Sequence, residues 1–304
     1  MSKYLRKRLI QIIPILFIVT VVVFILVNVT GDPTATMLPA DAPESARENL
    51  REALGLNKPL YEQYGIFINN LLHGNFGTSH KYNAPALGVV LERVPASLEL
   101  AGVALLLSVI ISIPLGIWSA RTQGSILDVF ISGFSVLGQA MPSFWVGIML
   151  ILVFAVNLSV LPVSGRGTWQ NLVLPSVTLA IGTSAQIIPL VRSSMLEIMH
   201  EDFIRTARSK GLREWVVIYK HAFKNALVPV VTMVALQIPN LIGGALITET
   251  VFAWPGLGQL MLQGINNRDM AIVQTCILLI TMVTILANLL ADLLYCLIDP
   301  RIKY

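Results

Sequence analysis

The sequence predicts an all-α polytopic membrane protein with six transmembrane helices and a small external helical cap between the first two. Three observations lead to this prediction. The 304 residues are 55% apolar and only 12% charged, which leaves too little polar surface to coat a water-soluble globule of this size. Six long stretches carry almost no charge, and the basic residues gather in the segments on one side of these stretches.

The six charge-poor stretches each come close to or exceed the length of a membrane-spanning helix. A helix rises about 1.5 Å per residue and must cross about 30 Å of hydrocarbon, which takes about 20 residues. The stretches are Leu9–Thr30, Leu100–Ala120, Val129–Asn157, Leu172–Val191, Ala226–Thr248 and Met270–Ala291.

Lysine and arginine are divided unevenly between the connecting segments. If both ends of the chain lie in the cytoplasm, fourteen of the 21 basic residues are cytoplasmic, which agrees with the positive-inside rule. The net charge of +4 does not indicate nucleic-acid binding, because the charges do not form a basic face with base-reading side chains. The fourteen residues are Lys3, Arg6, Lys7, Arg8, Arg121, Arg192, Arg205, Arg208, Lys210, Arg213, Lys220, Lys224, Arg301 and Lys303.

Residues 1–30 are predicted to form the first transmembrane helix. Four basic residues precede an apolar run that is longer than the core of a secretory signal, and no small-x-small cleavage site follows Val29. We therefore expect an uncleaved helix.

Residues 31–96 mix acidic and basic residues and are predicted to form the external cap. Pro43–Leu54 has the composition of a helix that ends at Gly55. Pro59, with its preset backbone angle, starts a second predicted helix. Its apolar residues at helical spacing are expected to pack the cap on the transmembrane bundle, and these are Leu60, Tyr64, Phe67, Ile68 and Leu71.

Residues 97–298 hold the five later spans, in which polar side chains are expected to face the protein interior or a water-filled path. Helix-to-helix packing is the alternative role for such positions. In the fifth span we expect a broken helix near the membrane midplane, around Pro239, whose free backbone groups meet a polar solute. The candidate residues of a path are Gln139, Ser143, Gln186, Gln237 and Asn240.

The basic segment Glu201–Pro229 separates the fourth and fifth spans. A first amphipathic helix, Asp202–Lys210, is predicted to end at Gly211, because glycine adopts left-handed backbone angles freely. A second one, Glu214–Phe223, precedes Pro229, where the next apolar run opens. We predict two short helices hinged at Gly211. On periodicity alone, a charged loop that only orients the protein is an equal alternative.

Three blocks of residues resemble the peptide and nickel branch of the ATP-binding-cassette (ABC) importer permeases. They occur in the order found in that family, and the resemblance spans nearly the whole chain. The blocks are Leu54–Tyr64 with Gly74–Ser79, then Arg205-Thr206-Ala207 with Gly211 and His221–Pro229, and finally Val251–Gly258. In this family the second block is a coupling loop that docks into a groove on a cytoplasmic ATPase, and the third is an external re-entrant stretch.

Two positions depart from the general pattern of the family. That pattern has Glu-Ala-Ala where this chain has Arg205-Thr206-Ala207, and a Leu-Pro where Phe223-Lys224 stands, with the proline coming later at Pro229. The resemblance implies that both departures are normal for the peptide branch. It also implies the ATPase-coupling residues, which are Asp202, Arg205, Thr206, Ala207, Lys210, Gly211, His221, Asn225 and Pro229.

The resemblance further implies a type I importer fold and a bacterial inner-membrane location, with residues 299–304 as a cytoplasmic tail and 201–225 as the coupling loop. The expected function is the permease subunit of an ATP-driven importer for di- or oligopeptides or related small solutes. The expected partners are two ATP-binding subunits, a second and usually different permease, an external solute-binding protein and membrane lipid, without nucleic acid.

Motifs for catalysis are not found in the sequence. There is no Gly-x-x-x-x-Gly-Lys-Ser/Thr loop to cradle nucleotide phosphates, so ATP and magnesium are expected on the partner subunits. The four histidines are scattered, and Cys276 and Cys296 lie about 30 Å apart on a straight helix, beyond disulfide reach. We expect no enzyme activity, cofactor or metal in this chain. An ion-coupled secondary carrier, a membrane-anchored scaffold and import of a nickel or metal chelate remain as alternatives.

Overall fold

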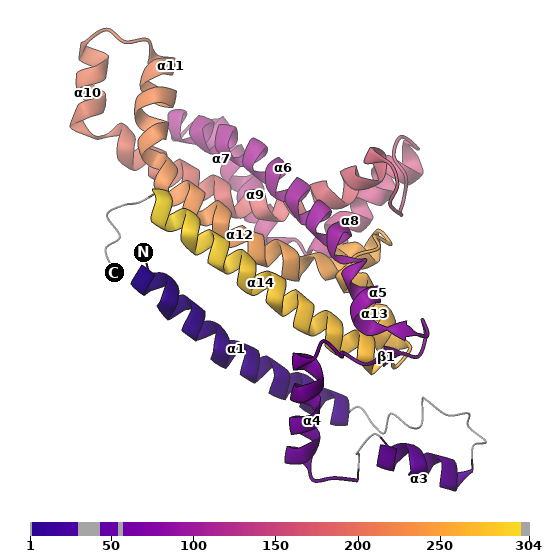
Figure 1. The fold of residues 1–304 in the computed structure, drawn as a ribbon. Coiled ribbons are helices and arrows are strands. Elements are labelled where there is room, and N and C mark those ends of the chain that lie inside the picture. The colour runs from indigo at the N-terminus through magenta and orange to yellow at the C-terminus, as the bar shows by residue number, and fades with distance from the viewer. Residues whose placement is uncertain (1, 30–42, 54–56, 299–304) are drawn as a thin grey trace. The chain divides into compact units, whose positions relative to one another are not determined.

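The computed structural model describes residues 2–29, 43–53 and 57–298, and it is almost entirely helical (Figure 1). The chain divides into two compact units. One unit joins Met1–Ala96 to Pro255–Val283, and the other joins Ser97–Trp254 to Thr284–Tyr304. Gly55, which was expected to close a helix, and the predicted tail 299–304 lie outside the described residues.

The first unit begins with α1 (Ser2–Val29), followed by α3 (Glu44–Ala53) and α4 (Leu60–Leu72). A short antiparallel hairpin, β1 (Thr78–Ser79) and β2 (Ala84–Pro85), leads into α5 (Ala86–Leu91). The later chain adds α13 (Leu257–Asn266) and the first part of α14 (Met270–Ile298). The tight hairpin adds a small amount of strand to the predicted all-α fold.

The core of the first unit forms where α5, α13 and α14 meet. Ala86, Val90, Leu260, Ile272 and Cys276 are fully or almost fully buried there. The hairpin is fixed to the corner between α13 and α14 by Asp269, whose carboxylate accepts hydrogen bonds from Ser79 Oγ (2.5 Å) and the Lys81 backbone N–H (3.3 Å).

The second unit holds most of α6 (Val94–Arg121), then α7 (Ile126–Ala140), α8 (Ser143–Leu150) and the π-helix η1 (Ile151–Asn157). The long helix α9 (Trp169–Met199) follows, and then α10 (Asp202–Ser209), α11 (Glu214–Val216) and the π-helix η2 (Val217–Phe223). The helix α12 (Lys224–Val251) continues directly from η2. Figure 1 shows α10 and α11 as a hairpin at one end of this unit.

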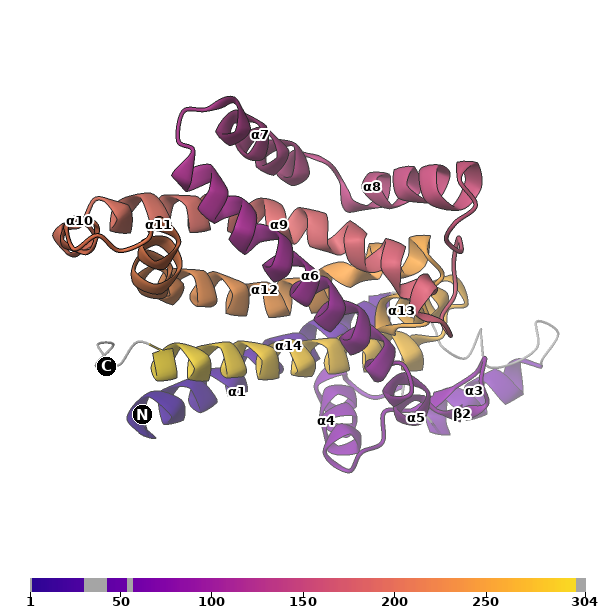
Figure 2. The ribbon, with the colours of Figure 1, turned by 90° about the horizontal axis from the view of Figure 1, so that it is seen from above.

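Helix α9 is the centre of the second unit, where it packs against α7, α8 and α12. It runs beside α12 in both views (Figure 1 and Figure 2). Small residues bring its neighbours close: a Cβ on Gly138 of α7 would lie 2.8 Å from the Ala185 Cβ, which is too short for real contact. This close packing of small residues is typical of helix interfaces in membranes.

Five described helical stretches are long and apolar enough to cross a membrane, and a bent pair raises the number to six. The bent pair corresponds to the predicted third span, Val129–Asn157. Its first half is α7, its second half is α8 together with η1, and the helix axis bends by 108° between them. Figure 2 shows this corner. Met141 is extended (φ −79°, ψ 128°) because it precedes Pro142, which starts α8. The predicted third span is therefore a sharply bent pair of helices.

Three expectations need correction. Helix α12 runs without a break through Pro229 and Pro239, so the predicted break near the midplane does not form. A proline removes one backbone donor, but well-packed membrane helices tolerate this loss. The second loop helix is not separate, since η2 continues into α12. The predicted fourth span, Leu172–Val191, lies inside a longer helix that begins at Trp169, where Thr168 and Asn171 form a capping box.

Candidate functional site

The first arm of the basic loop is α10, which ends in a Schellman motif at Gly211. The Gly211 N–H donates to the Arg208 carbonyl (2.9 Å), and the Leu212 N–H donates to the Ala207 carbonyl (3.4 Å). Gly211 has φ +75°, in the left-handed region that favours glycine. The prediction that Gly211 ends this helix is confirmed by the geometry.

Helix α10 buries one face and exposes its charges. Ile204 and Ala207 are buried in a cluster with Val217, Ile218 and Met195, which lie on η2 and α9. Arg205 remains 79% exposed, 3.8 Å from Asp202, and Lys210 is also exposed. Thr206 Oγ donates to the Asp202 carbonyl (3.0 Å) within the helix. The loop is therefore a packed hairpin whose charged side chains are exposed.

An ion pair that sequence reasoning did not identify connects the two arms across Gly211. Arg208 Nη2 lies 2.8 Å from Glu214 Oε1, and Arg208 Nε donates to Glu214 Oε2 (3.4 Å). The hydrogen bonds that Arg208 donates to the Glu214 carboxylate raise the pKa of the guanidinium above its usual value. Together with the Schellman motif, this pair holds the bend at Gly211 in one geometry.

The second arm is one continuous helical stretch that runs from the loop into the middle of the unit. Val217, Ile218 and Ala222 on η2 are buried against α9 and α10. His221 is half-buried, and its carbonyl accepts a hydrogen bond from Asn225 Nδ2 (2.7 Å). The stretch Glu214–Val251 passes the length and apolarity test for a membrane span as a single stretch.

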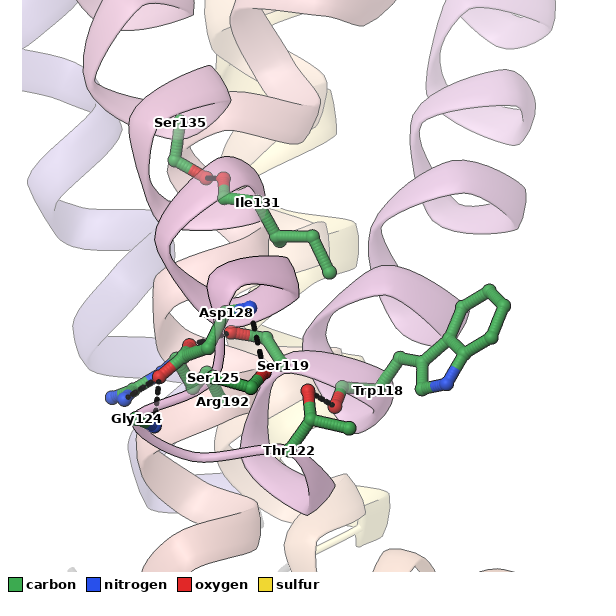
Figure 3. Close-up of polar contacts among 9 residues, drawn as sticks. All are labelled: Trp118, Ser119, Thr122, Gly124, Ser125, Asp128, Ile131, Ser135 and Arg192. Atoms are coloured by element: carbon green, nitrogen blue, oxygen red, sulfur yellow. Dashed lines mark hydrogen bonds and ion pairs between the residues drawn. The ribbon is translucent and has the colours of Figure 1, made fainter.

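A buried ion pair lies at the start of α7, where Asp128 binds Arg192 of α9 in a bidentate contact (Figure 3). The two distances are 2.7 Å (Nε to Oδ1) and 2.8 Å (Nη2 to Oδ2). Ser119 Oγ (2.5 Å) and the Gly124 backbone N–H (3.0 Å) also donate to the Asp128 carboxylate. The side chain of Asp128 is 7% exposed and that of Arg192 is 28% exposed. This pair fixes the turn between α6 and α7 to α9.

A cavity of about 200 Å³ opens among α7, α8, α9 and α12. Its residues are mainly small or polar, and none of the described residues that line it carries a charge. They are Gly138, Met141, Ser143, Val146, Thr178, Leu179, Ile181, Gly182, Thr183, Gln186, Gln237, Asn240, Leu241 and Gly244.

Four of the five candidate path residues line this cavity, and three of them form a chain of amides. Gln237 Nε2 donates to Gln186 Oε1 (3.1 Å), and Asn240 Nδ2 contacts Gln237 Oε1 (3.4 Å). Ser143 lines the cavity from the first turn of α8. Gln139 does not line it, because its Nε2 donates to the Ala185 carbonyl (2.8 Å) instead.

Several residues of the site could not be identified from the sequence. Gly182 and Gly244 contribute open space to the cavity rather than a functional group, so no chemical signal marks them. The Asp128 position does carry a local signal, since Ser125 and Asp128 have the spacing of a helix cap, and Asp128 N–H donates to Ser125 Oγ (3.3 Å). Within the described part of the chain, no three His, Cys, Asp or Glu side chains are arranged to hold a metal ion.

Comparison with known protein families matches nearly the whole chain. Residues 112–304 match the model of the binding-protein-dependent transport system inner membrane component. Residues 1–101 match the N-terminal model of the same kind of membrane component.

Three curated relatives align over the full length of both proteins. The dipeptide transport system permease protein DppB of Alkalihalophilus pseudofirmus is 39% identical. The oligopeptide transport system permease protein AppB of Bacillus subtilis is 37% identical. The glutathione transport system permease protein GsiC of Escherichia coli K12 is 39% identical.

The fold is also similar to solved transporter structures. A chain of the MetNI methionine ABC transporter in an inward-facing conformation superposes with a TM-score of 0.58 at 20% identity, covering 69% of this chain and 96% of that one. This likeness supports the type I importer fold. The chain belongs to the family of binding-protein-dependent transport system inner membrane components, and it is a multi-pass permease subunit of an ABC importer.

Proposed function

We propose that this permease subunit imports di- or oligopeptides and that its loop 201–225 is driven by cytoplasmic ATPase subunits. The named solutes of the three relatives are dipeptides, oligopeptides and glutathione, which all contain amide bonds. An uncharged cavity with the amides of Gln186, Gln237 and Asn240 offers both hydrogen-bond donors and acceptors to such solutes. The cavity would form part of the translocation path.

One observation carries the mechanical part of the proposal: the loop and the cavity share a continuous helical stretch. Val217 and Ile218 near its start pack on α10, while Gln237, Asn240 and Gly244 further along line the cavity. A force on α10 is therefore transmitted along η2 and α12 to the cavity wall. The prolines at 229 and 239 leave the helix unbroken, so the stretch can act as a lever.

The free-energy difference that such a lever must transmit is moderate. To change an inward-facing to outward-facing ratio from 1:99 to 99:1, ATP must favour the outward-facing state by about 5.5 kcal/mol. The Arg208–Glu214 pair and the Schellman motif at Gly211 keep the two arms of the loop in a fixed geometry, which supports their movement as one body.

The orientation and the partners are also part of the proposal. The excess of basic residues in the loop and near both ends supports cytoplasmic termini. The complex would contain two ATP-binding subunits that hold ATP and magnesium, a second homologous permease and an external solute-binding protein. The uncharged lining of the cavity disfavours an ion-coupled secondary carrier, which needs ionisable groups within the membrane.

Uptake by reconstituted vesicles tests the proposal. Vesicles that contain the complete complex and its binding protein should take up a labelled dipeptide when ATP is supplied on the loop side. Vesicles that lack the ATPase subunits should not. ATP-independent accumulation of the dipeptide would contradict the proposed driving force, and uptake of a metal chelate without peptide would contradict the proposed substrate.

A further inference from the structure

The helix α4, in the segment predicted to be an external cap, packs directly on the first transmembrane helix. The hydroxyl of Tyr64 is hydrogen-bonded to Thr20 Oγ1 of α1 (2.9 Å). The Tyr64 ring makes edge contacts with Phe17 (6.3 Å between centroids) and Phe24 (5.4 Å), and Phe67 lies 5.9 Å from Phe24. Both helices belong to the same compact unit.

The position of these contacts along α1 sets the depth of α4. The apolar window of α1 is Ile10–Val27, with a mean hydropathy of 3.1. Thr20 lies near the middle of this window, about 10 Å before its end at Val27. A tyrosine side chain spans only part of that distance, so the backbone of α4 at Tyr64 lies within the last turns of the apolar window rather than in the water beyond it.

The exposed surface of α4 suits a position in the membrane, because its apolar face extends beyond the residues that contact α1. Tyr64 and Phe67 face α1, whereas Leu60, Tyr61 and Leu72 remain 64%, 75% and 81% exposed. At 3.6 residues per turn, Tyr61 and Leu72 project from the same side of the helix. The side opposite the middle of the whole apolar face carries the exposed residues Glu62, Asn69 and Asn70, and of these Asn70 lies directly opposite Tyr61 and Leu72.

We propose that α4 is an interfacial helix that lies in the membrane leaflet at the C-terminal end of α1, with Leu60, Tyr61 and Leu72 in contact with lipid. A helix with one apolar and one polar face lies with its apolar face about 5–10 Å into the boundary between headgroups and acyl chains, and tyrosine is enriched at this level. Under the proposed topology this is the outer leaflet. The inference stands on α1 and α4 alone and does not depend on the solute or on the ATPase.

Spin labels on adjacent residues of α4 test this inference. The complete transporter, with Cys276→Ala and Cys296→Ala, would carry one label at position 61 or 72, or at the polar positions 62 or 70. For each label in lipid nanodiscs, the frequency of collision with oxygen, which concentrates in lipid, is measured and compared with the frequency of collision with a water-soluble nickel chelate. ATP-dependent uptake by each labelled complex shows that it is folded.

The labels at positions 61 and 72 should show a several-fold higher ratio of oxygen to nickel accessibility than the labels at 62 and 70. Equal nickel accessibility at all four positions would place α4 in water and overturn the inference. Exclusion of both reagents from positions 61 and 72 would also overturn it, because a protein partner rather than lipid would then cover this face.

Discussion

Asp128 in the first turn of α7 and Arg192 in the C-terminal half of α9 form a bidentate ion pair, in which Asp128 is almost completely buried. The carboxylate accepts two more hydrogen bonds, from Ser119 and Gly124. Breaking a buried pair by removing one partner leaves the other charge uncompensated. The pair is thus a fixed joint between the turn of α6 and α7 and the helix that leads to the loop.

Arg192→Ala should lower the free energy of unfolding by about 3 kcal/mol, because it leaves the Asp128 carboxylate without its main partner. Arg192→Lys should recover only part of this loss, since lysine cannot make the bidentate contact. Denaturant unfolding of the purified protein in detergent measures both values. The matched control is Arg208→Ala, which breaks a half-exposed pair and should cost less than about 1 kcal/mol. Equal losses of unfolding free energy for Arg192→Ala and Arg208→Ala would show that the buried pair contributes no more to stability than the half-exposed one.

Gly211→Val should uncouple ATP hydrolysis from uptake. The left-handed conformation at φ +75° costs a β-branched residue about 1–2 kcal/mol, although there is open space for a side chain. The loop should therefore lose its bend while the rest of the protein stays folded. The ratio of ATP hydrolysed to peptide imported, measured in vesicles, should rise sharply.

Gly74→Val is the control for this prediction, because Gly74 also has φ +75° and open space around its Cβ position. It should leave the coupling ratio unchanged. Gly211→Asn should restore coupling, since asparagine tolerates left-handed angles. Normal coupling in Gly211→Val would show that the bend at Gly211 is not needed.

Arg205→Glu should weaken binding of the ATPase subunits with little change in stability. Arg205 is 79% exposed, and its contact with Asp202 at 3.8 Å is a surface pair worth at most about 1 kcal/mol. Co-purification of the ATPase subunits with the permease measures the effect. Lys58→Glu, the same charge change at an exposed residue of the predicted cap, should leave co-purification intact. If both variants retain the ATPase equally, Arg205 serves only to orient the loop.

Gly244→Leu should abolish peptide uptake without unfolding the protein. A Cβ at Gly244 meets no atom within 4 Å, and the residue lines the cavity, so the leucine side chain occupies cavity space. The neighbouring Gly243 also has open space but does not line the cavity. Gly243→Leu should therefore keep near-normal uptake, and loss of uptake in both variants would argue against this cavity as the path.

Hydropathy and charge predicted the spans and the loop because both depend on local composition. A run such as Met270–Ala291 must be helical to satisfy its backbone in lipid, and the structure has α14 there. The stop at Gly211 was also predictable, since the Schellman motif needs only a glycine after a helical turn. Four of the five polar residues chosen for a path line one cavity, because a polar side chain in an apolar span has few places to lie other than the protein interior.

The corner at Pro142 and the continuity of α12 could not be predicted from composition. Pro142 ends α7, whereas Pro189 and Pro239 lie inside α9 and α12 without breaking them. The same residue type has opposite outcomes because packing against neighbouring helices decides whether the missing hydrogen bond can be tolerated. The Asp128–Arg192 pair joins residues 64 positions apart, and sequence spacing gives no information about such a contact.

The central claim is that the loop transmits force along α12 to the cavity, and the reactivity of a cysteine in the cavity tests it most directly. In the complete complex with Cys276→Ala and Cys296→Ala, Asn240→Cys is labelled with a membrane-impermeant thiol reagent, with and without ATP trapped on the ATPase subunits. The labelling rate should change on ATP trapping with the natural loop and stay constant with Gly211→Val. An equal change with both loops, or no change with the natural loop, would contradict the claim.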